Sequence, residues 1–158
     1  MQKTDNEIDK VNDLVKRAKL AGADAADAIY VEGTSLSISC RKGLSETLSR
    51  SEGMDIGLRV FLGQRQAMVS SSDFSSKGLD ELVDRCISMA RVVPEDEFCG
   101  LAPEDLLAQG SEDLDNFDPI EITENELGAR ALEAEDAALS IQGVTNSEGA
   151  EASWGRIL

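Results

Sequence analysis

The sequence contains no histidine. This absence excludes several kinds of site within these residues: the Ser-His-Asp and Cys-His nucleophile systems, HExxH zinc helices and His-led deaminase centres. The chain has three cysteines, which lie far apart and without CxxC spacing: Cys40, Cys86 and Cys99. They predict neither a zinc site nor a disulfide framework, and we expect buried thiols in a reducing cytosol. The chain is thus predicted to be neither a self-sufficient histidine-dependent enzyme nor a zinc hydrolase.

Aromatic residues, long apolar runs and basic residues are also scarce. Aromatics make up only 4% of the chain, so the core must consist mostly of Leu, Ile, Val and Ala. No run approaches the roughly 18 apolar residues of a membrane helix, and the first ten residues lack the apolar region of a signal peptide. These two absences predict a cytoplasmic protein.

The charge balance is strongly acidic, with 31 acidic and 15 basic residues and a formal net charge of −16. Such a charge repels phosphate backbones and anionic membranes, which disfavours binding to nucleic acid or to a membrane. Its simplest consequence is solubility. The alternative is an acidic face that meets a basic partner or peptide.

Helical patterns occur in three places. Thr4 and Glu7 have capping-box spacing, and a helix is predicted over about 5–20, with Gly22 as a left-handed cap. A second helix begins near Asp73 and Ser75 and ends before Pro94, with an apolar stripe that includes Cys86 and Met89 and is expected to be core. A third follows the capping-box pair Thr123 and Glu126, with helical spacing of Leu127, Ala131, Ala134, Ala138 and Ile141.

Alternating patterns predict the strands. They cover 25–32, 35–41, a stretch from residue 44, and 55–62, which is the clearest, followed by a hairpin return over 65–72. The end of the sequence, 148–158, has the pattern of a further strand. We therefore predict an α+β fold for one domain, 1–158: an antiparallel four- to five-stranded meander sheet with about three helices packed on one face. The expected order is α-β-β-β-β-β-α-α-β.

An acidic stretch separates the last two helices. Residues 95–126 contain twelve Asp or Glu and no Lys or Arg, and we interpret 95–122 as a crossing loop with one helical turn at 103–108. The alternative interpretation is a docking surface. The acids do not follow the EF-hand spacing, so a calcium loop is not predicted.

Other residues that could be catalytic or ligand-binding are better explained by structural roles. The run 70–73 (Ser-Ser-Ser-Asp) has no base beside it and suits a strand end followed by a helix cap. The glycines of 53–63 lie within and after a strand, which favours twist and turn roles over a phosphate loop. Arg59 and Arg65 are expected to pair with acids, although either could bind a peptide carboxylate. No catalytic, cofactor-binding or metal-binding residue is predicted, and no substrate-binding residue is assigned.

One binding mode would leave almost no trace in a sequence. An antiparallel sheet with a polar face can bind an extended peptide as an added edge strand, through backbone hydrogen bonds alone.

Four segments together resemble the amino-terminal domain of the PmbA (TldE) branch of the TldD/PmbA family. They are GADAADAIYVEGTSLSISCRKG (22–43), GMDIGLRVFLGQRQAMVSSSDFS (53–75), RVVPEDEFCGLAPEDLL (91–107) and TNSEGAEAS (145–153). Most of the resemblance lies in 22–25, 57–60, 72–73 and 146–150. It extends over essentially the whole chain and implies one domain of a longer protein.

The resemblance implies a cytosolic metalloprotease assembled from a TldD-type and a PmbA-type subunit, which acts on unfolded peptides, peptide antibiotics and small antitoxins. Its members are historically described as modulators of DNA gyrase. The zinc-binding HExxxH motif belongs to the carboxyl-terminal region of the TldD-type subunit, and nothing in this sequence matches it. The expected partners are a TldD-like subunit, the carboxyl-terminal domain of the longer protein and an extended peptide, and the zinc is expected in the TldD-like subunit.

Two function hypotheses follow. The first is a non-catalytic amino-terminal domain of a PmbA-like subunit. The second is a free-standing acidic binding or regulatory protein with a basic partner, and a small acid-based enzyme is a third option that would require carboxylates of raised pKa.

Overall fold

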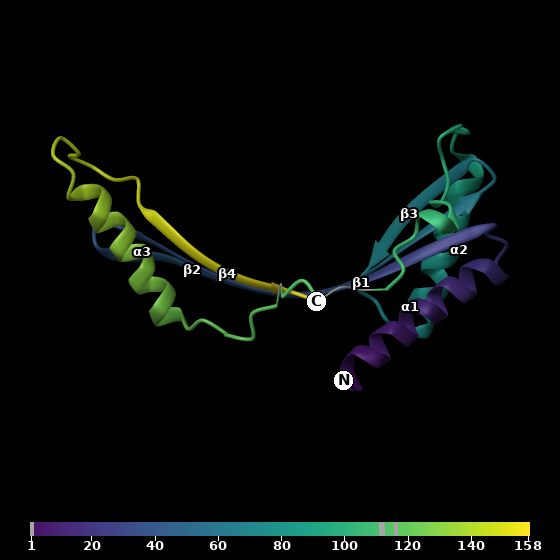
Figure 1. The fold of residues 1–158 in the computed structure, drawn as a ribbon, viewed down its shortest axis with the longest axis horizontal. Helices are drawn as coiled ribbons and strands as arrows, with labels where there is room; N and C mark the ends of the chain where they lie inside the picture. The colour runs from purple at the N-terminus through teal and green to yellow at the C-terminus, as the bar shows by residue number, and fades with distance from the viewer. Residues whose placement is uncertain (1, 111–112, 116) are drawn as a thin grey trace. The chain divides into compact units, whose positions relative to one another are not determined.

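The computed structural model describes residues 2–110, 113–115 and 117–158, with side chains from residue 6 onward. The elements in chain order are α1 (Gln2–Leu20), β1 (Ala25–Arg41), β2 (Leu44–Leu62), β3 (Arg65–Ser71), α2 (Ser76–Val92), the 3-10 turn η1 (Glu104–Leu106), α3 (Glu124–Leu139) and β4 (Ala150–Ile157) (Figure 1). The strands form one antiparallel sheet in the order β3-β2-β1-β4. This confirms the predicted α+β class.

The first two strands are longer than the pattern predicted. β1 continues through Gly33, where a break between two strands was expected, and β2 continues through Gly53. Neither glycine has a positive φ angle, so each keeps the extended backbone of its strand. Gly33 is also held in a ladder, since it pairs with Ile157 of β4. Three strands therefore precede α2 instead of five.

The chain divides into two compact units. Unit 1 consists of Met1–Val31 and Met54–Ser111, and unit 2 consists of Glu32–Gly53 and Glu112–Leu158. β1 and β2 each contribute one part to each unit.

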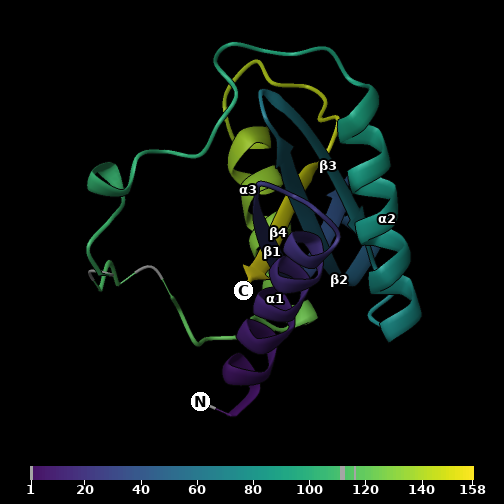
Figure 2. The same cartoon turned by 90° about the vertical axis from the view of Figure 1, so that its right-hand side faces the viewer.

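In unit 1, α1 and α2 cover one face of the sheet formed by β1, β2 and β3 (Figure 2). The apolar positions of β2 alternate with polar ones, so that one set enters the core. The buried core consists of Leu14, Ala18, Ala23, Ile56, Leu58, Val60, Ala67, Leu79, Leu82, Val83, Cys86, Ile87 and Ala90.

The two helices of unit 1 end at recognisable signals, but the start predicted for α1 was wrong. α1 begins at Gln2, so Thr4 lies inside the helix and not at an N-cap, and its side chain is outside the described part. Gly22 ends α1 with φ 103°, and the Ala23 N–H donates to the Ala18 carbonyl at 3.1 Å, which confirms the predicted left-handed cap. α2 ends at Val92, two residues before Pro94.

The predicted apolar stripe of α2 is core except at Met89 and at Val93, which is only half-buried and follows the end of the helix. Cys86 is fully buried, whereas Met89 is 42% exposed, so its assignment to the core was wrong. Met89 lies at the margin of the helix face that meets the sheet, where a long flexible side chain can remain in solvent.

In unit 2, α3 packs on β1 and β4. Its predicted capping box is present, since the Thr123 N–H donates to Glu126 Oε2 at 2.8 Å and the Glu126 N–H donates to Thr123 Oγ1 at 3.3 Å. The buried face consists of Leu127, Ala131 and Glu135, whereas the predicted Ala134, Ala138 and Ile141 are exposed. The core of unit 2 is small and consists of buried Leu36, Ile38 and Leu127 with Ile122, Ala152 and Trp154 against them.

Between α2 and α3 the described residues form no helix or strand except the single turn η1, which lies inside the predicted turn at 103–108. Of the acidic segment 95–122, residues 111, 112 and 116 lie outside the described part. In the described part of the chain, no helix is both long and apolar enough to cross a membrane.

Candidate functional site

The face of the unit 1 sheet opposite the helices is exposed around Gly57 and Arg59, although Phe61 on the same face is buried; we refer to the exposed part as the open face. Alternation along β2 sends Ile56, Leu58 and Val60 into the core, and it therefore places Gly57 and Arg59 on the other face. The pairing of β2 with β3 sets Arg59 opposite Met68, which is 68% exposed. The open face thus carries both charged and apolar side chains.

A groove of about 410 Å³ lies on this face. Its lining comes from three strands: Asp27, Ala28 and Ile29 of β1, Gly57, Leu58 and Arg59 of β2, and Met68 of β3. We refer to it as the Gly57 groove.

An ion pair forms one side of the Gly57 groove. Arg59 Nε donates to both carboxylate oxygens of Asp27, at 3.0 and 3.1 Å, and Arg59 Nη2 donates to Asp27 Oδ2 as well. The hydrogen bond to Asp27 raises the pKa of Arg59 above its ordinary value. The guanidinium carbon lies 5.1 Å from the centre of the Phe61 ring, close enough for a cation–π interaction. Both side chains of the pair are consequently held in place.

The absence of a side chain at residue 57 lets Ile29 approach the floor of the groove closely. A β-carbon at this position would lie 3.1 Å from Ile29 Cγ2, closer than ordinary van der Waals contact. Ile29 is 62% exposed and Met68 forms a second exposed apolar wall. A shallow apolar slot between two exposed side chains results.

The edge of the sheet beside this groove is β3. In the sheet order, β3 is the last strand, and among the described residues its one strand partner is β2, from Ile56 opposite Ser71 to Leu62 opposite Arg65. Its outer edge has the geometry that strand addition by an extended peptide requires. Whether a peptide uses it remains a prediction.

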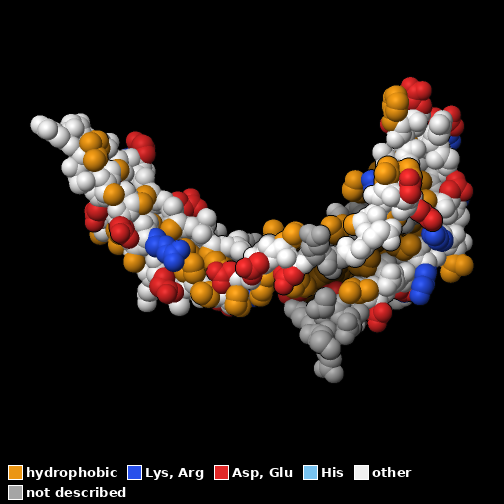
Figure 3. Space-filling view, viewed as in Figure 1, with side chains coloured by type: hydrophobic (Ala, Val, Ile, Leu, Met, Phe, Trp, Pro, Cys, Tyr) orange, Lys and Arg blue, Asp and Glu red, His pale blue; other side chains and the backbone are white. Residues whose placement is uncertain are grey.

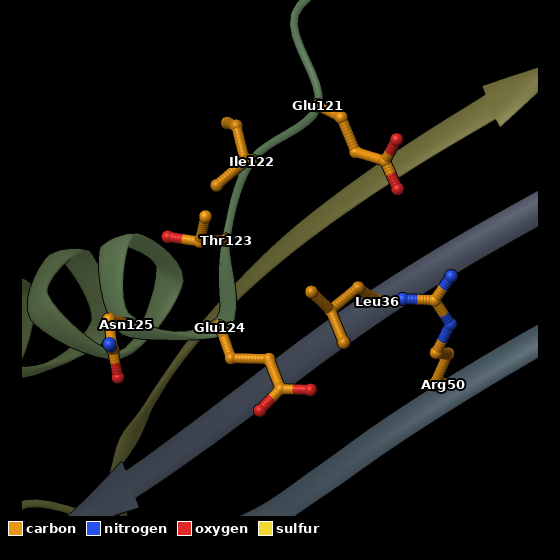
Figure 4. Close-up of a pocket in the computed structure, with 7 residues that line it drawn as sticks. All are labelled: Leu36, Arg50, Glu121, Ile122, Thr123, Glu124 and Asn125. Carbon is orange, nitrogen blue, oxygen red and sulfur yellow. The ribbon is translucent and has the colours of Figure 1, made fainter.

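Unit 2 contains a second, more polar pocket of about 550 Å³ (Figure 4). Leu36 forms its apolar floor, and Arg50, Glu121 and Glu124 extend over it from different segments. Arg50 Nη2 already pairs with Glu52 Oε1 at 2.6 Å, and that hydrogen bond raises the pKa of Arg50. At the α3 N-terminus, the N–H groups of Thr123 and Glu126 are already bonded within the capping box.

A buried carboxylate connects α3 with the turn between β1 and β2. Lys42 and Gly43 form this two-residue turn with φ angles of 53° and 72°, the left-handed pair of a type I′ turn. Their N–H groups each donate to Glu135 at 2.9 Å, and Glu135 is only 1% exposed. The N–H groups of Gly43 and Lys42 lower the pKa of Glu135. Glu135 therefore acts as a structural link, which the search for chemistry in the sequence missed.

Most residues in the segments that carry the resemblance stabilise the fold through backbone contacts. Asp24, in 22–25, accepts the Gly63 N–H at 2.7 Å and donates its own N–H to the Phe61 carbonyl at 3.0 Å. Gly149, in 146–150, has φ 109°, and a β-carbon there would lie 2.6 Å from the Cys40 carbonyl oxygen. In the segment 57–60, by contrast, Gly57 and Arg59 lie on the open face.

The two arginines, the run 70–73 and the cysteines have mainly structural roles. Arg59 and Arg65 do pair with acids, Arg65 Nη2 with Glu95 Oε1 at 3.2 Å. The run 70–73 serves the start of α2, because Asp73 Oδ1 accepts the Ser75 N–H at 2.9 Å and the N-cap Ser75 accepts the Gly78 N–H at 3.0 Å. Of the three free cysteines, two are buried as expected and Cys99 is partly exposed.

Asp27, Ile29 and Met68 were not predicted as parts of a site. The alternating pattern of one strand does not show which residues of the adjacent strands lie next to it, and the groove is formed by residues of three adjacent strands. A better signal was the lone Gly57 in the strongest strand, since glycine inside a strand often marks a close approach.

No metal centre can be assembled from the residues described. Among them, no group of three or more His, Cys, Asp or Glu side chains is placed to hold a metal ion. Acidic side chains are numerous over the face drawn in Figure 3, but they are spread out. The donor set does not fit zinc, which is bound mostly by His and Cys in closed or open tetrahedral sites.

Comparison with known proteins gives concordant results. Residues 26–90 match the model of PmbA/TldA metallopeptidase domain 1. The chain is 32% identical over 128 residues to metalloprotease PmbA of Escherichia coli O157:H7, a match that covers 80% of this chain and 28% of that protein. It is 31% identical over 137 residues to a metalloprotease PmbA homolog of Haemophilus influenzae, covering 86% of this chain and 30% of the relative. The chain thus spans less than a third of the length of these two relatives.

Two solved structures share the fold. TldE from Thermococcus kodakarensis aligns with a TM-score of 0.71 at 15% identity, over 94% of this chain and 34% of that one. A candidate modulator of DNA gyrase from Bacteroides thetaiotaomicron aligns with a TM-score of 0.74 at 16% identity, over 97% of this chain and 35% of that one.

Proposed function

Because this chain carries the first domain of the PmbA/TldD metalloprotease family, we propose that it is the non-catalytic amino-terminal domain of a PmbA-like subunit. In this proposal the subunit joins a TldD-type subunit, which supplies the zinc, and this domain helps to hold unfolded peptides. The observation that carries the proposal is the 32% identity to metalloprotease PmbA, and the lack of any histidine in these residues supports a non-catalytic role for this domain. A zinc centre of the HExxxH kind needs two histidines, and these residues offer none.

The open face of unit 1 supports the peptide-holding part. Extended peptides bind sheets through backbone hydrogen bonds at an edge and through shallow side-chain slots. Unit 1 offers the outer edge of β3 and, on the same three strands, the Gly57 groove.

The test is a peptidase assay with purified components. The 158-residue chain is incubated with an unstructured fluorogenic peptide and Zn²⁺, alone and with a TldD-type subunit. We expect no cleavage by the chain alone and direct binding between the chain and the TldD-type subunit in size-exclusion chromatography. Zinc-dependent, chelator-sensitive cleavage by the chain alone would overturn the proposal, and so would a failure of the two proteins to associate.

A second function has one observation in its favour. In the acidic segment 95–122, several large apolar side chains are exposed to solvent, among them Phe98 at 88% exposure and Leu106 at 72%. Acidic residues interspersed with exposed apolar ones suit a basic, apolar partner. Replacement of 97–109 by a Gly-Ser linker of equal length should abolish capture of such a partner while the TldD-type association remains. If it instead abolishes that association, the segment belongs to the first function.

A further inference from the structure

We propose that the Gly57 groove is a side-chain pocket for a neutral apolar residue, such as Leu, of an extended peptide. This inference rests on the proposed function and specifies the class of peptide that the domain holds.

The charges of the groove favour a neutral occupant. Asp27 and Arg59 cancel each other through a bidentate pair, so the groove has no net charge in a chain of net charge −16. An acidic side chain would meet the overall acidic field. A basic side chain would have to compete with Arg59 for Asp27, and Arg59 is already hydrogen-bonded and stacked on Phe61.

The shape of the groove favours one side chain. The groove lies over Gly57 and Arg59, with Ile29 Cγ2 close above Gly57 and Met68 opposite Arg59, and both of these apolar side chains are more than 60% exposed. An inserted aliphatic side chain would remove apolar surface of Gly57, Ile29 and Met68 from water. In the part of the structure that is described, Arg59 Nη1 donates no hydrogen bond, so it can donate to a peptide carbonyl beside the inserted side chain.

The size of the groove disfavours a second copy of the chain as the occupant. Seven residues line it, whereas a stable protein–protein interface takes about 20–30 residues on each side. A short peptide segment matches this footprint.

The test uses the ¹⁵N-labelled 158-residue chain and three unstructured ten-residue peptides that differ only in the central residue, Leu, Ala or Lys, and whose other nine residues are uncharged. We expect the Leu peptide to shift the amide resonances of Ile29, Gly57 and Met68. The dissociation constant should be at least about tenfold weaker for the Ala and Lys peptides, since removal of even one methylene from a pocket has effects of that order.

Two variants fill or charge the groove. Gly57→Ala adds a methyl group against Ile29 at an ordinary backbone angle, and Met68→Lys adds a charge at an exposed position, so both should fold. Each should weaken binding of the Leu peptide about tenfold or more. The matched control is Gly53→Ala in the same strand, where a β-carbon meets nothing within 4 Å and binding should not change.

The remaining outcomes separate this inference from the proposed function. Equal binding of the Leu peptide to wild type and Gly57→Ala, or equal binding of the Lys peptide, would overturn the inference. Shifts confined to the outer edge of β3 would overturn it as well, but would leave the peptide-holding function standing. Binding of none of the peptides would overturn both. A concentration-dependent dimer that Gly57→Ala abolishes would show that a second copy occupies the groove, against the inference.

Discussion

At the scale of single residues, Glu135 is the side chain whose charge matters most to the fold. It is buried, and it accepts the N–H groups of both turn residues, Lys42 and Gly43. In the part of the chain that the structure describes, Glu135 is the partner recorded for both of these donors. The carboxylate must therefore stay ionised to accept both bonds, which agrees with its lowered pKa.

The first prediction concerns the pH dependence of this link. The folded pKa of Glu135 lies below its ordinary value of 4.5, so its stabilisation is present above that value and is lost as the pH falls through the lower folded pKa. Glu135→Gln should lower the Tm at pH 7 by about 5 °C or more, because an amide oxygen replaces two acceptors and its NH₂ group faces donors. The loss should shrink in acid, as measured by circular dichroism melts at pH 7 and pH 3.

The control for this prediction is Glu133→Gln, an exposed position of the same helix. It should leave the Tm nearly unchanged at both pH values. A Glu135→Gln deficit of the same size at pH 7 and pH 3 would mean that packing, and not the ionised carboxylate, explains the loss.

Residue-level prediction from the sequence was mostly good where the signal is local, with the cap expected at Thr4 as an exception, and poor where it depends on a distant partner. The cap at Gly22 and the capping box of Thr123 and Glu126 are set by neighbours within a few positions, and both are present. Glu135 was missed because its partners lie more than 90 positions away in the chain. The helical periodicity of the sequence alone does not show whether a glutamate at position 135 is buried or exposed to solvent.

At the scale of elements, the start of α2 shows two residues that constrain each other. The Asp73 carboxylate accepts the Ser75 N–H, which lowers the Asp73 pKa, and it occupies the space beside the α-carbon of Gly78. A β-carbon on Gly78 would lie 2.5 Å from Asp73 Cγ. The glycine in the first turn of α2 is thus explained by the carboxylate in front of it.

A double-mutant cycle tests this pairing. Gly78→Ala in the Asp73→Ala background should stabilise the protein by about 0.5–1 kcal/mol, the helix-propensity gain of alanine over glycine. With Asp73 present, the same substitution should raise the free energy of unfolding little or not at all. The new β-carbon would displace the Asp73 carboxylate, which would then lose its hydrogen bond to the Ser75 N–H. Urea unfolding of the four variants gives the coupling.

Gly128→Ala in α3 is the reference for the cycle, since its β-carbon would meet nothing within 4 Å. It should give the propensity gain whether or not Asp73 is present. Additive effects of the Asp73 and Gly78 substitutions would show that the two residues do not constrain each other.

The strands show where element prediction failed. The sequence pattern located every strand region, but the breaks expected near Gly33 and Gly53 do not exist. Glycine weakens a strand locally, whereas the ladder with a neighbour, such as Gly33 opposite Ile157, decides whether the strand continues. Such pairing joins residues far apart in the sequence, and a short window cannot detect it. The same limit hid the groove, which exists because Ile29 and Met68 lie beside Gly57.

At the scale of the whole molecule, the two units differ greatly in the size of their cores. Among the described residues, the contiguous core cluster of unit 1 has thirteen buried members drawn from both helices and the sheet, whereas that of unit 2 has three. Stability within a protein follows buried apolar contact, and regions with few such contacts open first. Unit 2 depends correspondingly more on polar links, of which Glu135 is the most buried.

Amide hydrogen exchange should therefore be uneven along the chain. We expect the amides of α2 and β3 to exchange most slowly, with a protection close to that of global unfolding. Those of α3 and β4 should exchange at least about tenfold faster, a difference of about 1.4 kcal/mol in opening free energy.

Gly149→Ala, which forces a β-carbon to within 2.6 Å of the Cys40 carbonyl oxygen, should accelerate amide exchange in unit 2 and leave the exchange rates of α2 unchanged. Gly155→Ala, with its nearest contact at an ordinary 3.7 Å from the Thr34 oxygen, serves as the control. Equal protection of both units would show that β1 and β2, which run through both, make the chain open as one cooperative body.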